Sequence, residues 1–208
     1  MNKPLIDQLL AKPNVTLVGV TKKHTKAEVD ELAALGVQVF GENRVQEFLE
    51  KYDPAYTWHL IGHLQTNKVK YVVGKVDVIE SVDSLKLAQE IDKQARKLGI
   101  RQKILIEVKI SDDPNKTGLP LSQLEDLVQA VQTMDHLVWK GLMCIASHTD
   151  DEQKVAQEFD EMKKLFDAYQ KQYPQIDTLS MGMSQDYALA IEHGSNMVRI
   201  GTALFEKK

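Results

Sequence analysis

The stretch Leu17-Val18-Gly19-Val20-Thr21-Lys22 decides the interpretation of this sequence. It is a short apolar run rich in valine, and residues 26–35 after it have helical periodicity. A strand followed by a helix is the repeating unit of a parallel sheet with helical crossovers. If that unit recurs along the chain, the fold class is α/β.

Seven further strand-like runs follow, at 37–40, 58–61, 76–80, 103–110, 137–143, 178–181 and 197–200. Segments with helical periodicity follow the strand-like runs, at 26–35, 44–51, 65–73, 84–98, 121–134, 151–173, 185–193 and 202–205. Gly36 and Gly99 suit the ends of two helices, and Ser84 and Ser122 suit the starts of two others. Eight units in about 200 residues predict a single (β/α)8 TIM barrel domain over residues 1–208. An open doubly wound sheet is the alternative, but no G-x-G-x-x-G follows the first strand.

Composition excludes several classes of protein. With 43% hydrophobic and 27% charged residues, the chain has the make-up of a globular protein, not of a disordered or fibrous one. Its net charge is -4 and both signs are scattered along it, so nucleic acid is not an expected partner. No stretch approaches the ~18 consecutive apolar residues of a membrane span, and no secretory signal is evident at the N-terminus. The lone Cys144 has no intrachain partner, and we expect a buried thiol in a cytoplasmic protein.

The parity of the first strand gives Lys22 a special place. Val18, Val20 and Lys22 share one face, so if the valines point into the barrel, Lys22 projects into its mouth. A lysine amine in such a pocket can form a Schiff base with an aldehyde. A solvated surface lysine is the alternative.

The last two units suggest a phosphate site. Residues 180–184 (Ser-Met-Gly-Met-Ser) and 199–202 (Arg-Ile-Gly-Thr) each follow a strand and precede a helix. Barrels often bind a phosphate between these two loops, although the same residues could simply cap the helices. A rim lysine together with a phosphate site is the arrangement that holds pyridoxal 5'-phosphate, an aldehyde tethered to a phosphate.

Seven strings along the chain resemble the YggS/PROSC family, the pyridoxal phosphate homeostasis proteins. They are Gly19-Val20-Thr21-Lys22, Phe40-Gly41-Glu42-Asn43 with Val45-Gln46-Glu47, the run from Trp58 to Lys68, Lys116-Thr117-Gly118, Gly141-Leu142-Met143, the run from Ser180 to Asp186, and Arg199-Ile200-Gly201-Thr202. They occur in the family's order and span nearly the whole chain. The resemblance implies a barrel of the alanine racemase N-terminal type, which is the fold type III of pyridoxal phosphate proteins.

The resemblance also implies site residues and a role. By position it assigns the Schiff base to Lys22, phosphate contacts to Ser184, Gly201 and Thr202, the place facing the pyridine nitrogen to Arg199, and a place beside the ring to Asn43. It implies a monomer that buffers or delivers the cofactor, with apo pyridoxal phosphate enzymes as recipients, and without established catalysis. An arginine at the ring nitrogen fits this, because a permanent cation disfavours protonation of that nitrogen and weakens the ring as an electron sink.

The sequence departs from the family pattern at a few positions. Residues 23–25 differ in the turn after Lys22, and Lys109, Cys144 and Glu206 stand where Asn, Thr and Gly are more usual. Lys109 puts a charge near the rim after the fifth strand, which leaves any secondary ligand there open. None of these changes removes an implied cofactor contact.

Two enzymatic alternatives stay open. A racemase-like enzyme of this barrel type needs a second acid or base from an added domain, for which no residues remain after the eighth unit. A sugar-phosphate aldolase could use Lys22 with Asp186, Glu42 or Glu80, although as helix-start or loop residues these carboxylates suit capping or solvation.

The six histidines have no metal-ligand spacing, so we expect no metal site. Lys68, Lys70 and Lys75 fit a solvated helix face rather than a nucleic-acid patch.

Overall fold

The strands of the chain form a closed parallel barrel. A computed structural model describes residues 1–114 and 116–206; Asn115, Lys207 and Lys208 lie outside the described residues. The barrel strands are β1 (Thr16–Val20), β2 (Val39–Glu42), β3 (Thr57–Leu60), β4 (Val78–Val82), β5 (Gln102–Lys109), β7 (Leu137–Met143), β8 (Thr178–Ser180) and β9 (Met197–Ile200). Each strand pairs in parallel with its neighbours, β1 lies between β2 and β9, and the pairing of β4 with β5 completes the ring. The predicted (β/α)8 barrel is confirmed.

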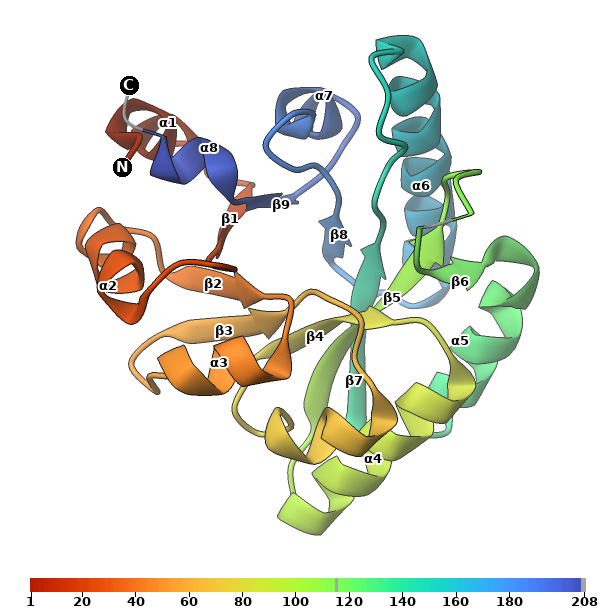
Figure 1. Cartoon of the computed structure of the whole chain (residues 1–208). Helices are drawn as coiled ribbons and strands as arrows, with labels where there is room; N and C mark the ends of the chain where they lie inside the picture. The colour runs from red at the N-terminus through yellow and green to blue at the C-terminus, as the bar shows by residue number, and fades with distance from the viewer. Residues whose placement is uncertain (115, 207–208) are drawn as a thin grey trace.

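Helices cover the outside of the strands (Figure 1). They are α1 (Lys3–Leu10), α2 (Lys26–Ala34), α3 (Val45–Lys51), α4 (Leu85–Leu98), α5 (Leu124–Gln132), α6 (Glu152–Gln172), α7 (Tyr187–Glu192) and α8 (Thr202–Phe205), with 3-10 turns η1 (Thr66–Tyr71) and η2 (Leu121–Gln123). The large apolar cluster lies between helices and strands, where side chains such as Phe40, Trp58 and Phe159 are fully buried or nearly so. This layer holds the helices on the barrel, as the helical periodicity predicts.

Inside the barrel, an apolar layer lies below a polar one. Val78, Leu105 and Met143 form a small separate cluster within the ring. Two residues further along β4 and β5, on the same face, stand the buried carboxylates Glu80 and Glu107. Polar side chains therefore gather toward the carboxyl ends of the strands, the end at which barrel proteins bind ligands.

A few element predictions need correction. The segment 65–73 is not an α-helix, because it contains the 3-10 turn η1 (Thr66–Tyr71). Ser122 is not a helix cap, because it lies inside η2 and no side-chain cap bond starts α5. A short strand for which no prediction was made, β6 (Leu119–Pro120), pairs with β5. By contrast, Ser84 caps α4, and Gly36 and Gly99 have the positive φ expected after their helices.

The two ends of the described chain meet. The main-chain N–H of Asn2 donates to the Leu204 carbonyl at 2.7 Å, so α1 and α8 lie side by side (Figure 1).

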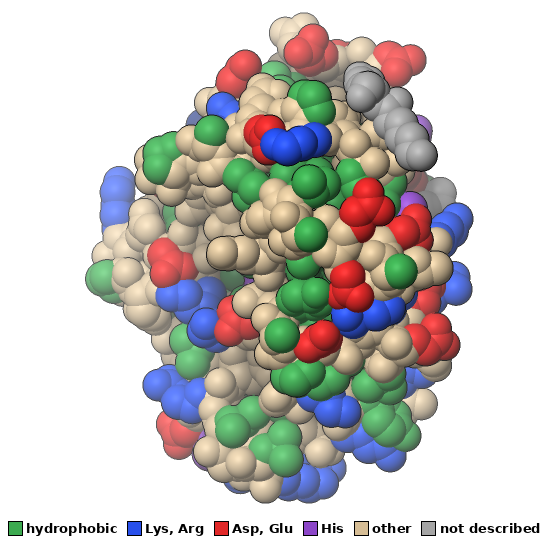
Figure 2. Space-filling model, turned by 90° about the vertical axis from the view of Figure 1, so that its left-hand side faces the viewer, with side chains coloured by type: hydrophobic (Ala, Val, Ile, Leu, Met, Phe, Trp, Pro, Cys, Tyr) green, Lys and Arg blue, Asp and Glu red, His purple; other side chains and the backbone are tan. Residues whose placement is uncertain are grey.

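On the side of the molecule where α1 and α2 lie, Figure 2 shows acidic and basic side chains interspersed. Among the described helices, none is long and apolar enough to cross a bilayer.

Candidate functional site

Lys22 stands two residues after the end of β1, in the turn that follows the strand. A Cβ on Gly19 would meet Val37, Phe40 and Leu204, so Gly19 faces the helices. Val18 and Val20 therefore face the barrel axis, and Lys22 has the same parity. Its side chain is exposed, and its amine makes no ion pair or hydrogen bond within the part of the chain that the structure describes. An exposed amine without such a partner therefore stands just after the carboxyl end of β1.

Asn43 directly follows β2, the strand that pairs with β1. Val20 is in register with Gly41, so Lys22 and Asn43 each stand two residues beyond this pair, after neighbouring strands. The Asn43 Oδ1 atom is buried and has no hydrogen-bond partner among the described residues. Because a buried polar atom without a partner is costly, this amide oxygen is available to a polar group of a ligand.

The two predicted phosphate loops touch each other. The backbone N–H of Ala203 donates to Ser184 Oγ at 3.4 Å, and the Arg199 N–H donates to the Gly182 carbonyl at 3.0 Å. A Cβ on Gly201 would lie 3.4 Å from Val20 Cβ, so this loop lies against the strand that carries Lys22. Ser184, in the loop after β8, and Thr202, the first residue of α8, thus stand at the same end of the barrel as Lys22.

Arg199 is buried in the barrel wall next to β1. Its partner in the register of the β1–β9 pair is Val18. Arg199 Nη1 donates to Ser180 Oγ at 2.6 Å, and Nη2 donates to the Cys144 carbonyl at 2.8 Å. Two hydrogen bonds from a planar guanidinium fix its orientation, so the cation is held below the site of Lys22.

A buried carboxylate completes this network. Glu80 accepts from Ser180 Oγ at 2.6 Å and contacts His59 Nδ1 at 2.7 Å, and Arg199 Nη1 lies 3.9 Å from Glu80 Oε2. Burial by itself would raise the pKa of Glu80, but the hydrogen bond and charge of His59, the charge of Arg199 and the Ser180 hydroxyl outweigh it and lower that pKa. Glu80 is thus the ionised counterpart of Arg199.

Sequence reasoning missed this network. Glu42 and Glu80 are not the helix-start or loop residues that the sequence suggested, because both lie in strands and are fully buried. A signal was present in the sequence: Glu80 alternates with Val78, so a carboxylate occupies an inward position of a strand. Asp186 precedes α7 and accepts from the Met183 N–H at 2.6 Å, as a local turn residue does.

The remaining inward side chains surround the mouth on the β5 side. Glu107 is buried and accepts from Thr117 Oγ1 at 2.6 Å. Burial raises the pKa of Glu107 against the effect of that hydrogen bond, and the Asp83 carboxylate adds to the rise. Lys109 follows it on the same face and is half-buried at the rim. This side of the mouth therefore holds a buried carboxyl whose pKa is raised above its ordinary value.

The lone thiol is buried, and two of the histidines, His59 and His63, contact carboxylates. Cys144 is buried, and desolvation raises the pKa of its thiol to about 12, so its thiol is unreactive in the native state. His59 pairs with Glu80, and His63 Nδ1 lies 3.5 Å from Asp83 Oδ2. Among the described residues, no group of three or more His, Cys, Asp or Glu could hold a metal ion.

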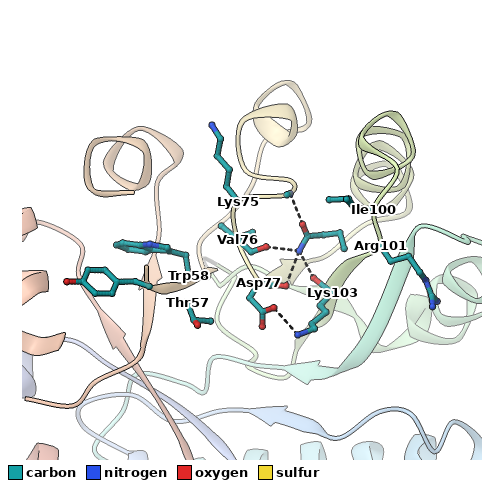
Figure 3. A pocket seen from close by; sticks show the side chains of 11 residues that line it. Thr57, Trp58, Lys75, Val76, Asp77, Ile100, Arg101 and Lys103 are labelled. Atoms are coloured by element: carbon teal, nitrogen blue, oxygen red, sulfur yellow. Dashed lines mark hydrogen bonds and ion pairs between the residues drawn. The ribbon is translucent and has the colours of Figure 1, made fainter. Parts of the chain in front are cut away.

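A cleft of about 450 Å³ lies at the opposite end of the barrel (Figure 3). Its walls come from the segments that lead into β3, β4 and β5. Gln102 is central to it: its Nε2 donates to the Val76 and Asp77 carbonyls at 3.1 and 3.0 Å, and its Oε1 accepts from the Gly74 N–H. Since Gln102 uses its polar atoms to join chain segments, this cleft has the character of a stabilising end, not of a binding site.

Comparisons with known proteins agree on one family. The family model described as alanine racemase, N-terminal domain, matches residues 2–207. The pyridoxal phosphate homeostasis protein of Aquifex aeolicus is 41% identical over 197 residues, covering 92% of this chain and 86% of that one. The protein of the same name in Escherichia coli K12 is 35% identical over 198 residues, covering 92% and 85%.

Solved structures give the same result. The structure of PipY from Synechococcus elongatus with pyridoxal phosphate bound has a TM-score of 0.91 and 33% identity, covering 99% of this chain and 100% of that one. A D-threonine aldolase from Filomicrobium marinum, at 19% identity, 98% and 58% coverage and a TM-score of 0.82, shares the fold. The chain belongs to the alanine racemase N-terminal domain family and, within it, to the YggS/PROSC pyridoxal phosphate homeostasis proteins.

Proposed function

We propose that this protein binds pyridoxal 5'-phosphate and serves in its homeostasis, with residues 1–208 acting as one binding domain. One observation carries the proposal: Arg199 and the loop that follows it lie beside the strand that presents Lys22, and the two loops suited to phosphate touch. The PipY relative, solved with this cofactor bound, matches the chain over its whole length.

The residues present fit the cofactor chemically. Its aldehyde supplies an electrophilic carbon, which condenses with a primary amine and releases water. Lys22 provides an unpaired amine at the barrel mouth, and Asn43 provides a buried amide oxygen without a partner beside it. Ser184, Gly201 and Thr202 would provide hydroxyl and main-chain donors to the phosphate, and the Arg199 guanidinium would stand toward the ring nitrogen.

We further propose binding without catalysis. The Arg199 guanidinium is held by Ser180 and the Cys144 carbonyl, with Glu80 as its counter-ion, so it keeps its charge and its place. A fixed cation there disfavours a proton on the ring nitrogen, which lowers the capacity of the ring to stabilise a carbanion. Buffering or delivery to apo pyridoxal phosphate enzymes is the role that fits, in a cytoplasmic monomer. Size-exclusion chromatography tests the monomer.

A spectroscopic experiment tests the proposal. The purified protein is titrated with pyridoxal phosphate, and the visible near-violet absorbance of the adduct is recorded before and after borohydride reduction. Lys22→Ala abolishes this absorbance and the reduced mass adduct, because no other amine occupies its place. Lys23→Ala, which removes the neighbouring lysine of opposite parity, keeps both.

The phosphate loops are tested in the same assay. Ser184→Ala and Thr202→Ala each weaken pyridoxal phosphate binding by roughly 3- to 10-fold, since each removes one of several donors. Neither changes the affinity for pyridoxal, which has no phosphate. A colourless wild-type protein would contradict the proposal and favour a sugar-phosphate aldolase, and an unchanged spectrum in Lys22→Ala would refute the lysine assignment.

A further inference from the structure

Lys51 is a buried lysine on α3 that points at the main chain before Lys22. Its side chain is only 6% exposed. Its Nζ donates to the Thr21 carbonyl oxygen at 2.7 Å and to Glu42 Oε1 at 2.6 Å, and lies 3.7 Å from Glu47 Oε2. Thr21 is the residue directly before Lys22. The charge of Lys51 is thus placed under the turn that carries the proposed cofactor lysine.

The same helix also holds the main chain after Lys22. The Lys23 N–H donates to Glu47 Oε2 at 2.9 Å. Glu47 and Lys51 are four residues apart on α3, so they stand one above the other on one helix face. Lys51 fixes the carbonyl before Lys22 and Glu47 fixes the amide after it. The Lys22 backbone is held from both sides by one rigid element.

The turn itself needs this support. The His24 N–H donates to the Thr21 carbonyl at 3.0 Å, which closes a four-residue turn with Lys22 and Lys23 in the middle. Lys23 has a φ of 65°, and among the described residues it is the only one other than glycine with a positive φ. A side chain disfavours this conformation, so the surrounding contacts must maintain it.

The buried charges are costly for a purely structural role. Glu42 is fully buried, accepts from Thr21 Oγ1 at 2.6 Å, and leaves its Oε2 without a partner among the described residues. An apolar pair of similar volume would often pack at least as stably as a buried ion pair. Buried charges that contact the main chain on both sides of Lys22 indicate a task beyond packing.

We infer that Lys51, together with Glu47 and Glu42, is a positioning group that fixes the turn at Lys22 so that its amine meets the cofactor aldehyde at the barrel mouth. The inference rests on the proposed function. Lys51 itself does not touch the cofactor. Its effect is transmitted through the Thr21 carbonyl and the Lys23 amide, which set the direction in which the Lys22 side chain leaves the turn.

The test compares two ligands that differ only at the reacting carbon. Pyridoxal phosphate has an aldehyde there, whereas pyridoxine 5'-phosphate has an alcohol and cannot join to an amine. Dissociation constants for both are measured on the wild type, Lys51→Met and Lys51→Arg. Lys103→Met serves as the control, because it removes an ion pair with Asp77 at the other end of the barrel.

A positioning role predicts a split between the ligands. Lys51→Met weakens pyridoxal phosphate binding roughly tenfold or more and slows formation of the borohydride-reducible adduct, because the amine is misplaced. Its affinity for pyridoxine phosphate stays within about twofold of the wild type. Lys51→Arg restores much of the pyridoxal phosphate affinity, and Lys103→Met leaves both ligands unchanged.

Other outcomes overturn the inference. Equal losses for both ligands in Lys51→Met show a structural role only, and no loss shows no role. If Lys51→Met does not fold, Glu47→Gln is used instead, because the Glu47 side chain is partly exposed. This variant should lose affinity for pyridoxal phosphate but not for pyridoxine phosphate, with a smaller loss than in Lys51→Met. Equal affinity losses for the two ligands, or no loss, overturn the inference. A wild type that forms no adduct overturns the proposed function and this inference together, whereas adduct formation unaffected by Lys51 overturns the inference alone.

Discussion

Arg199 and Glu80 are opposite charges buried in the barrel and bridged by the Ser180 hydroxyl. Each charge would be strongly disfavoured there on its own, and each makes the other tolerable. His59 adds a second partner to the carboxylate at 2.7 Å. Single residues in this region therefore act as parts of one network, and removing one leaves the others unpaired in a low-dielectric interior.

Glu28 provides a prediction at the residue scale. It closes a capping box with Thr25 at the start of α2, and the hydrogen bonds from the Thr25 main chain, His24 and the Thr25 side chain lower the pKa of Glu28 to about 2. A carboxylate with a lowered folded pKa stabilises the fold above its unfolded pKa of about 4.5 and loses that effect as the pH falls toward about 2. Glu28→Gln should therefore be less stable than the wild type at neutral pH.

The measurement is urea unfolding at a series of pH values. The gap between wild type and Glu28→Gln narrows below about pH 4.5 and closes near pH 2. Glu31→Gln, an exposed carboxylate on the same helix, shows no such trend. A gap that stays constant down to the acid limit would contradict the role of the Glu28 charge.

At the scale of elements, the two ends of the strands have different tasks. The carboxyl ends carry Lys22 and the loops suited to phosphate, while Gln102 joins the amino ends of β4 and β5 (Figure 3). Gln102 is 3% exposed and connects β5 to the segment before β4. This separation follows the general division of barrels into a functional face and a stabilising face.

Gln102→Ala tests the division. The substitution leaves the Gly74 N–H and the Val76 and Asp77 carbonyls without this partner, which lowers the free energy of unfolding by about 1–3 kcal/mol. Pyridoxal phosphate affinity stays unchanged because the cofactor would bind at the other end. Urea unfolding and the absorbance titration measure the two effects, with the exposed Gln129→Ala as control. A loss of affinity without a loss of stability would count against the division.

At the scale of the whole molecule, the N-terminal segment contacts α8, next to the loop that we assign to phosphate. Asn2 is buried, its Oδ1 accepts from the Leu5 N–H at the start of α1, and its Nδ2 donates to the Ala203 carbonyl at 3.0 Å. The Ala203 N–H in turn donates to Ser184 Oγ. The His24 ring stacks on Phe205 with 3.4 Å between ring centroids. The start of the chain thereby supports the loop that we assign to phosphate.

Asn2→Ala loosens this contact. It removes a helix cap and a buried hydrogen bond, so the free energy of unfolding falls by about 1–2 kcal/mol. The melting temperature falls by about 2–4 °C for each kcal/mol lost. Binding of pyridoxal phosphate weakens as well, whereas binding of pyridoxal, which lacks the phosphate, does not. Calorimetry and the absorbance titration are the measurements, and the exposed Asn14→Ala is the control. Equal effects on both vitamers would contradict the proposed link to the phosphate loop.

Much of the fold could be read from local patterns. The eight strands and most helices were predicted within a few residues, because alternating short apolar runs and amphipathic segments depend on sequence neighbours. The η1 segment was assigned to an α-helix because its apolar spacing fits either helix type. The strand β6 was missed because two residues carry no periodic signal.

The sequence alone determined the order of the barrel units, the inward parity of Val18, Val20 and Lys22, and the motifs that mark the family. Only the tertiary structure decided that Glu80, Ser180 and Arg199 form one network, and that α3 reaches the turn at Lys22 through Lys51. The physical reason is the separation along the sequence between the residues that interact. Strand and helix patterns arise between neighbours in the chain, whereas buried charges find their partners across the barrel, where Ser180 and Glu80 are 100 residues apart.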